Sequence, residues 1–193
     1  EIGGVKTVAS VGEIGHSVDL AIIATPAPTI PDLVAQAGAS GVACAIILTA
    51  GLGHGPGSLA EKAERTARTC GLRLIGPNCL GVIAPAAKLN ASFASAMPPE
   101  GDLAVISQSG AIAAAMVEWG IAHRIGFSAI VSVGDQIDAD FGDLLDYFAL
   151  DPATRAILLY IESIKDARKF ISAARAAARV KPVVVIKSGR LAQ

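Results

Sequence analysis

Short aliphatic runs alternate along the chain with segments in which apolar residues recur every three or four positions. The runs are bounded by Gly, Pro, Thr or Asn, which is typical of buried strands, and the longer spacing is typical of amphipathic helices. The pattern predicts strands at 18–24, 42–48, 72–75, 102–106, 127–133, 155–161 and 183–187. It predicts helices at 30–39, 58–70, 110–122, 141–148 and 166–179.

Single helices between successive strands predict right-handed crossovers and parallel sheets. Three prolines interrupt the pattern between residues 82 and 101, and we place a domain boundary at the end of this stretch. The sequence therefore predicts an α/β fold with helices on both faces of parallel sheets, in two domains at 1–98 and 99–193. The first residues lead into a strand and the last follow one directly. We therefore expect both domains to be partial and the chain to be a piece of a longer protein.

Composition and charge narrow the chemistry. Hydrophobic residues make up 52% of the 193 residues and aromatic residues 4%, so we expect an aliphatic core. The 16 basic and 17 acidic residues nearly cancel, and the sequence has no basic stripe of the kind that nucleic-acid binding needs. The three cysteines lack paired spacing, which argues against a disulfide scaffold or a metal site and favours a cytoplasmic protein. An uncharged stretch between Asp32 and Glu61 is broken by Gly and Pro, so we expect no membrane span.

The turn 107–110, with the sequence Ser-Gln-Ser-Gly, is the strongest chemical signal in the chain. It follows a predicted buried strand and opens directly into a predicted helix. Free backbone N–H groups and the positive end of the helix then face one point, an arrangement that binds anions such as phosphate. Serine is also a favoured N-cap, so the alternative is that Ser109 only caps the helix.

Six motifs, read in order, resemble the α-subunit region of NDP-forming acyl-CoA synthetases, and the resemblance covers essentially the whole chain. The motifs are Gly76-Pro-Asn-Cys-Leu-Gly-Val82, Ser107-Gln-Ser-Gly110, Gly126-Phe-Ser128, Asp151-Pro152, Leu159-Tyr-Ile-Glu162 and Lys181-Pro-Val-Val-Val-Ile-Lys-Ser-Gly-Arg190. The family includes succinyl-CoA synthetase, ADP-forming acetyl-CoA synthetase and bacterial protein-lysine acetyltransferases that carry a ligase-like region. The chain is most similar to the acetyl-CoA synthetase and acetyltransferase-linked members.

The resemblance implies a Rossmann-like CoA-binding domain at 1–98 and a flavodoxin-like domain at 99–193. It implies the reaction acyl-CoA + ADP + phosphate ⇌ acid + ATP + CoA, in which a histidine carries the phosphoryl group to a nucleotide. CoA and a small carboxylic acid would be substrates. ATP or ADP with Mg²⁺ would bind to an ATP-grasp domain or β subunit outside this chain, and we expect the intact protein to form oligomers.

The resemblance also implies site residues. Glu162 is similar to the carboxylate that orients the phosphorylated histidine. Ser107, Ser109 and Gly110 match the helix end that holds its phosphate. Without the resemblance, Glu162 is interpreted as an exposed charge at a strand end. The expected CoA contacts lie in three loops, where small residues and prolines let the backbone approach a ligand: Pro26, Ala27 and Pro28; Leu48, Thr49 and Ala50; and Asn78 and Cys79.

The histidines are His16, His54 and His123, and none lies in the family's His-Thr-Gly or His-Ala-Gly motif. We expect all three on the surface and the catalytic motif beyond Gln193. The family's glycine-rich loop for the CoA phosphate is expected before Glu1.

Three further residues refine the hypothesis. Cys79 has no histidine nearby in the sequence, so we predict an inert, buried thiol. Ala114 stands where succinyl-CoA synthetases have a tyrosine, and Ala50 stands where they have an acidic residue. Both differences argue against succinate as the acid.

The leading hypothesis is therefore part of an ADP-forming ligase for acetate or another small acid, inactive as this chain alone. The alternative is a CoA- or acetyl-CoA-sensing regulatory region of a protein-lysine acetyltransferase, which need not keep the histidine. A nucleotide-binding dehydrogenase is disfavoured because no Gly-x-Gly-x-x-Gly motif follows a strand.

Overall fold

The computed structural model describes residues 1–189, so Arg190 of the sixth motif and the end of the predicted second domain lie outside the described residues. The strands are β1 (Leu20–Ile23), β2 (Cys44–Ile47), β3 (Arg73–Ile75), β4 (Gly81–Ala84), β5 (Leu89–Ser92), β6 (Glu100–Ser107), β7 (Phe127–Ser132), β8 (Ala156–Ile161) and β9 (Val183–Lys187). The α-helices are α1 (Ile30–Ala39), α2 (Leu59–Cys70), α3 (Gly110–His123), α4 (Phe141–Leu150) and α5 (Ala167–Ala178). Every predicted strand and helix is present, with bounds that differ by at most two residues.

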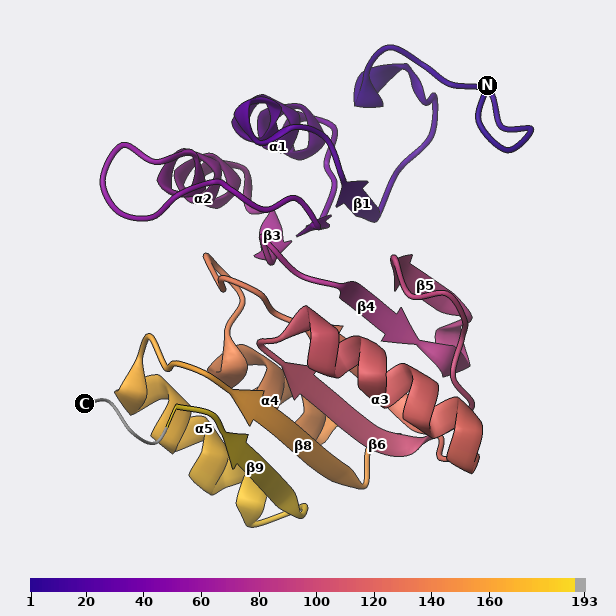
Figure 1. Ribbon diagram of the computed structural model, residues 1–193. Helices are drawn as coiled ribbons and strands as arrows, with labels where there is room; N and C mark the ends of the chain where they lie inside the picture. The colour runs from indigo at the N-terminus through magenta and orange to yellow at the C-terminus, as the bar shows by residue number, and fades with distance from the viewer. Residues whose placement is uncertain (190–193) are drawn as a thin grey trace.

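Strands β1, β2 and β3 form a parallel sheet in that order. Successive side chains of β2 point to opposite faces, as a strand requires. Ala45 and Ile47 pack with α1 and α2 in one core cluster. Ile46 packs with Cys79 and Ala91 on the opposite face. Helices α1 and α2 thus lie side by side on one face (Figure 1), and in the described part of the chain the prediction of helices on both faces does not hold for this sheet.

The second sheet has the order β5-β4-β7-β6-β8-β9. Strands β6 to β9 are parallel, and counted from β6 their order is 2-1-3-4, which begins the flavodoxin-like order. Val105 of β6 packs with α3 on one face. Ala104 and Ile106 of the same strand pack with α4 and α5 on the other face (Figure 1). Helices cover both faces of this sheet, as predicted.

Strands β4 and β5 lie where the sequence predicted irregular structure. They pair antiparallel with each other, and β4 pairs antiparallel with β7. The prediction of an entirely parallel sheet is therefore wrong for this sheet. Gly81 begins β4 with a φ of +119°, and a Cβ there would collide with the Ala91 carbonyl oxygen. A glycine in a short strand gives little strand signal, and the partner strand β7 is remote in sequence. The two sheets do not divide at residues 98 and 99, and the predicted domain boundary there stays a prediction.

Residues 133–139, which follow β7, run alongside β3 and the loop after it; we call them the linking segment. Three of its backbone N–H groups donate to carbonyl oxygens of that stretch: Ala139 to Leu74 at 3.1 Å, Ile137 to Gly76 at 3.2 Å and Asp135 to Pro77 at 2.9 Å. At Gly134, where φ is +50°, a Cβ would collide with the Pro77 carbonyl oxygen, so glycine permits this close approach. These contacts fix the two sheets relative to each other.

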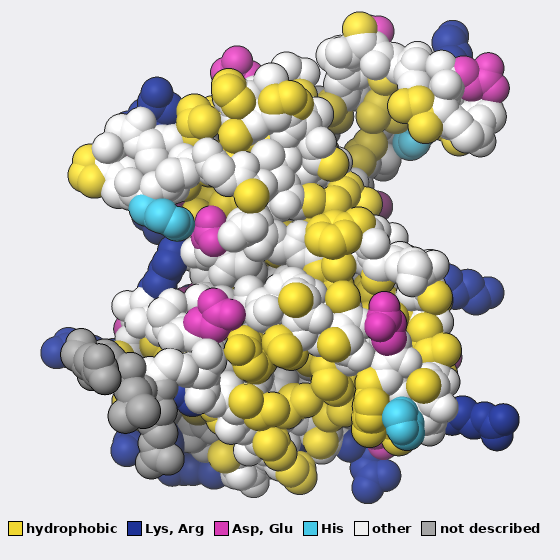
Figure 2. Space-filling model, in the orientation of Figure 1, with side chains coloured by type: hydrophobic (Ala, Val, Ile, Leu, Met, Phe, Trp, Pro, Cys, Tyr) yellow, Lys and Arg dark blue, Asp and Glu magenta, His cyan; other side chains and the backbone are white. Residues whose placement is uncertain are grey.

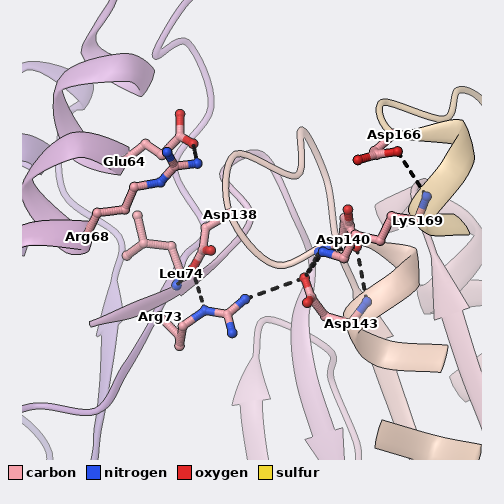
Figure 3. A network of polar contacts seen from close by, with 9 residues as sticks. All are labelled: Glu64, Arg68, Arg73, Leu74, Asp138, Asp140, Asp143, Asp166 and Lys169. Atoms are coloured by element: carbon pink, nitrogen blue, oxygen red, sulfur yellow. Dashed lines mark hydrogen bonds and ion pairs between the residues drawn. The ribbon is translucent and has the colours of Figure 1, made fainter. Parts of the chain in front are cut away.

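Charged side chains also connect the two sheets at this junction between β3 and the linking segment (Figure 3). Asp138 of the linking segment accepts hydrogen bonds from Arg73 Nε at 2.9 Å and from the Leu74 backbone N–H at 2.7 Å. Arg73 Nη2 lies 3.4 Å from Asp143 of α4, and Asp143 lies 2.7 Å from Lys169 Nζ of α5. The hydrogen bond with Asp138 raises the pKa of Arg73 above its ordinary value. One chain of contacts therefore connects β3 to both helices on one face of the second sheet.

Helix α3 is apolar on its outer face as well as its inner one. Ala113 and Val117 are buried against the sheet, whereas Trp119 and Ile121 are 46% and 41% exposed. Glu118 is the one acidic or basic residue of the helix apart from the terminal histidine. Figure 2 shows hydrophobic side chains gathered over α3. No helix within residues 1–189 has the length and apolar content of a membrane span. A helix that is apolar all round is typical of one covered by further protein.

Replacing Asp138 with alanine should destabilise the junction. The variant leaves the Leu74 N–H without its acceptor and Arg73 without its closest carboxylate. We expect the free energy of unfolding to fall by about 1–3 kcal/mol, the range for an unsatisfied, partly buried donor. Urea denaturation measures this. Asp102→Ala is the control, because its pair with Arg155 at 3.5 Å is exposed and should contribute less than about 1 kcal/mol. Equal losses in both variants would contradict the assignment.

Asp143 should make stability depend on pH in the acid range. Burial opposes its ionisation, but hydrogen bonds from Lys169 and the Asp140 backbone outweigh burial and lower the pKa of Asp143. A lowered native pKa stabilises the fold above the unfolded pKa of about 3.9, and this stabilisation is lost as pH falls through the native value. Asp143→Asn should therefore flatten the decline in stability between about pH 5 and pH 3 in urea titrations. Asp146→Asn, on the exposed side of α4, is the control. An unchanged decline in Asp143→Asn would contradict the assignment.

Candidate functional site

The candidate site lies at the carboxyl ends of β6 and β8, the neighbouring strands between which the chain order reverses. Ligands of open α/β sheets bind at such a switch point. A cavity of about 510 Å³ lies there. Its lining brings together five of the site residues predicted from the sequence: Asn78, Cys79, Ser109, Gly110 and Glu162. Residues assigned to CoA and residues assigned to phosphate thus share one cavity.

The cavity is lined by both polar and apolar side chains. The polar ones are those of Gln108, Asn78, Ser109 and Glu162. The apolar lining comes from the residues next to β4 and β5 and from α3: Leu80, Phe93, Ala111 and Ala114. None of the described residues that line the cavity is a lysine or an arginine.

The turn 107–110 is held by its own side chains. Ser107 is fully buried, and its hydroxyl donates to the Ser109 carbonyl oxygen at 2.7 Å and accepts from the Ser109 N–H at 3.2 Å. Ser107 therefore shapes the turn and does not line the cavity. Ser109 Oγ accepts from the Ile112 N–H at 3.3 Å, which confirms that Ser109 is the N-cap of α3.

Capping leaves the end of α3 able to bind an anion. Within residues 1–189, the backbone N–H groups of Gly110 and Ala111 have no protein acceptor. Both residues line the cavity. The first N–H groups of a helix and its positive end attract negative charge, so this end of the cavity suits a phosphate or carboxylate. The two interpretations of the turn are compatible.

Glu162 directly follows β8 and is exposed to solvent at the cavity. Its backbone N–H donates to Gln108 Oε1 at 2.9 Å, and its carbonyl oxygen accepts from Lys187 Nζ at 2.9 Å. Within the described residues its carboxylate makes no hydrogen bond or ion pair, so it is free for a ligand. Sequence reasoning did not single out the side chain of Gln108, because its partners lie 54 and 55 residues away.

The three loops assigned to CoA form a continuous edge. Thr49 Oγ1 donates to the Thr25 carbonyl oxygen at 2.6 Å, and the Asn78 N–H donates to the Thr49 carbonyl oxygen at 3.0 Å. Asn78 Nδ2 also donates to Asp135 of the linking segment at 3.2 Å. The remaining residues of the first two loops lie along this edge outside the cavity, with exposed or partly buried side chains: Pro26, Ala27, Pro28, Leu48 and Ala50. Only the third loop reaches the cavity.

Comparison with known families matches both halves of the chain. Residues 1–85 match the family described as a CoA binding domain, and residues 100–193 match the family described as a succinyl-CoA ligase like flavodoxin domain. The chain is 44% identical over 96% of its length to the acetate–CoA ligase (ADP-forming) I subunit alpha of Pyrococcus furiosus. It is 40% identical over 98% of its length to the acetate–CoA ligase (ADP-forming) of Methanocaldococcus jannaschii. The chain is a homologue of the ADP-forming acetate–CoA ligases.

The solved structure of a related synthetase has the same fold. The acetyl-coenzyme A synthetase 1 of Ca. Korarchaeum cryptofilum, in complex with phosphate and ADP, superposes with a TM-score of 0.92 at 37% identity. The match covers 99% of this chain and 42% of that one. The chain likewise spans 41% of the P. furiosus ligase subunit and 27% of the M. jannaschii ligase.

The cysteines of this ligase homologue differ in exposure. Cys79 is 4% exposed, and its thiol donates to the Ile47 carbonyl oxygen at 3.3 Å. Burial raises the pKa of the Cys79 thiol to about 12 and that of the partly buried Cys44 above its ordinary value. Cys70 is exposed. The prediction that Cys79 is buried is confirmed, and its high pKa explains why it would be inert although it lines the cavity.

The three histidines lie on the surface, as predicted. His16 and His54 are exposed in loops, and His123 is exposed at the end of α3, where its ring stacks on Trp119 at 4.7 Å. None of them lines the cavity at β6 and β8.

Thiol labelling should distinguish the cysteines. At pH 8, we expect a water-soluble thiol reagent to modify Cys70 in a first, fast phase of labelling. Cys79 should be modified only after denaturation, because it is buried and protonated. Peptide mass spectrometry identifies the modified residue. The variant Cys70→Ser should lose the first phase. Rapid modification of Cys79 in the native protein would show that its thiol is reactive and overturn the assignment.

Proposed function

We propose that the chain is the CoA-binding and phosphoryl-handling part of an ADP-forming acid–CoA ligase, which interconverts acyl-CoA, ADP and phosphate with acid, ATP and CoA. The observation that carries this proposal is the shared cavity. It joins the Asn78–Cys79 loop to the N-terminus of α3 and to Glu162. The acyl group and the phosphoryl group must meet in this reaction, and such a cavity provides one place for both.

The polar lining of the cavity supplies complementary groups for a phosphorylated histidine. The N–H groups of Gly110 and Ala111 would stabilise the negative phosphoryl oxygens. Glu162 repels phosphate but attracts an imidazole N–H, so it would orient the ring and raise its basicity. We place this histidine outside residues 1–193, because the chain's own histidines do not line the cavity.

CoA would follow the edge formed by the three loops. Small and proline-containing loops expose backbone groups along this edge and carry no bulky side chain that would block a pantetheine. Asn78, which is hydrogen bonded to both Thr49 and Asp135, would lie where the thiol end enters the cavity.

The acid is proposed to be acetate or another small monocarboxylic acid. The apolar lining at Leu80, Phe93 and Ala114 suits an apolar carbon chain. A dicarboxylate such as succinate would bring a second carboxylate beside Glu162, where no basic residue of the described lining could balance it.

A partner is part of the proposal. ATP or ADP with Mg²⁺ would bind to an ATP-grasp domain or subunit, and the apolar outer face of α3 supports burial against further protein in an oligomer. We propose a cytoplasmic location because the reaction uses ATP and CoA, which are cytoplasmic metabolites.

Phosphorylation of the full-length protein tests the function. The γ-phosphoryl group of labelled ATP should pass to the protein as ADP leaves, and the label should be lost in acid and retained in base, as for phosphohistidine. Glu162→Gln should slow labelling about 10- to 100-fold, the usual effect of removing a carboxylate that orients a functional histidine. Glu13→Gln, exposed near the N-terminus, is the matched control. No label, with CoA or acetyl-CoA still bound, would overturn the ligase proposal and favour a CoA-sensing region of a protein-lysine acetyltransferase.

A further inference from the structure

The side chain of Gln108 bridges the ends of two strands. It projects from the turn after β6, and Gln108 Oε1 accepts from the backbone N–H groups of both Glu162 and Ser163, each at 2.9 Å. Gln108 Nε2 donates to Ser163 Oγ at 2.9 Å. One amide therefore binds three groups of the loop that follows β8. Two adjacent N–H groups on one oxygen restrict rotation of that loop.

This bridge lies beyond the region that the sheet itself fixes. The last register pair between β6 and β8 is Ser107 with Tyr160, and the Gln108 backbone N–H donates to the Tyr160 carbonyl oxygen at 3.0 Å. Residues 162–166 are all exposed, so they have little packing to hold them. The pairing of the two strands is made without the Gln108 side chain, whereas the backbone N–H groups of Glu162 and Ser163 beyond the strands are bound by it.

Both backbone polar groups of Glu162 are thus held while its carboxylate is left free. Gln108 binds the N–H, and Lys187 Nζ of β9 binds the carbonyl oxygen at 2.9 Å. The same turn that contributes Gln108 continues into Ser109, the N-cap of α3. Gln108 therefore connects the turn that carries the free N–H groups of α3 directly to the loop that carries the Glu162 carboxylate.

We propose that Gln108 is a positioning residue that fixes Glu162 opposite the N-terminus of α3, so that a carboxylate and an anion-binding helix end face one cavity. The inference rests on the proposed function in that the group placed between them is a phosphorylated imidazole. Gln108 acts through Glu162 and makes no bond to a reacting atom.

Gln108→Met tests the proposal in the full-length protein, because methionine keeps the length of the side chain and loses the three hydrogen bonds of the amide. We expect the rate of phosphoryl labelling from ATP to fall about 10- to 100-fold, while the affinity for CoA, measured by calorimetry, is unchanged. Hydrogen exchange of peptides that cover 160–165 should become faster, and exchange within α3 should not. Gln36→Met, the same change on the exposed side of α1, is the control.

A double-mutant cycle separates positioning from a general loss of structure. If Gln108 acts through Glu162, Gln108→Met should have no further effect on labelling in a Glu162→Gln background, whereas independent effects would multiply. Multiplying effects, or a wild-type labelling rate in Gln108→Met, would overturn the proposal. If Gln108→Met does not fold, Gln108→Asn makes the same test, because it keeps the amide and shortens its reach.

The two proposals fail in different ways. Absence of label in the wild-type protein would overturn the proposed function and, with it, the role in phosphoryl transfer. Unchanged hydrogen exchange at 160–165 in Gln108→Met would overturn the positioning role even if the wild-type protein is labelled.

Discussion

The backbone pairing between the linking segment and the stretch after β3 is the constraint on which the site depends. One wall of the cavity, at Asn78 and Cys79, follows the first sheet, and the other, at the turn 107–110 and Glu162, belongs to the second. Only direct contacts between the two sheets can hold such walls at a fixed separation. The linking segment supplies these contacts through hydrogen bonds to backbone carbonyls, which any sequence could make, and through Gly134, where a side chain would not fit. Arg73 and Asp138 then lock the junction from the side.

Strand order explains why polar groups lie at the second wall. Because β6 and β8 are adjacent while their crossover helices lie on opposite faces, their carboxyl ends open into a crevice that no helix within residues 1–189 fills. The turn after β6 exposes helix N–H groups there, and the loop after β8 exposes a carboxylate. A ligand can bind to an anion-binding helix end and to a carboxylate at the same time only if one part of it is negative and another part is positive or donates a hydrogen bond. A phosphorylated imidazole, negative at the phosphoryl oxygens and positive or hydrogen-bonding at the ring, meets that condition.

Local patterns predicted nearly all of the fold, whereas contacts between distant segments were not predictable. Each predicted element was identified from an aliphatic run or from helical spacing, because these patterns lie within a few consecutive residues. Strands β4 and β5 were not predicted, because β4 begins with Gly81, whose own strand preference is weak, and pairs with the distant strand β7, while β5 pairs with β4. The cavity residues were predicted from motifs, but the bridge from Gln108 to Glu162 spans 54 residues, and glutamine has no pattern that reveals its partner. Ser107 was expected at the phosphate, but its hydroxyl makes hydrogen bonds to Ser109 inside the turn.

Helix α3 couples the site to whatever covers the molecule. Its first two turns line the cavity through Gly110, Ala111 and Ala114, while its outer face continues from Ala111 to the exposed Trp119. A protein surface that buries this apolar face would therefore meet the cavity at the N-terminus of the helix. Burial there would also exclude water from the free N–H groups, and an anion bound in a drier site interacts more strongly with them. The apolar composition of α3, which a solvated helix does not need, is thus explained if the covering protein completes the site.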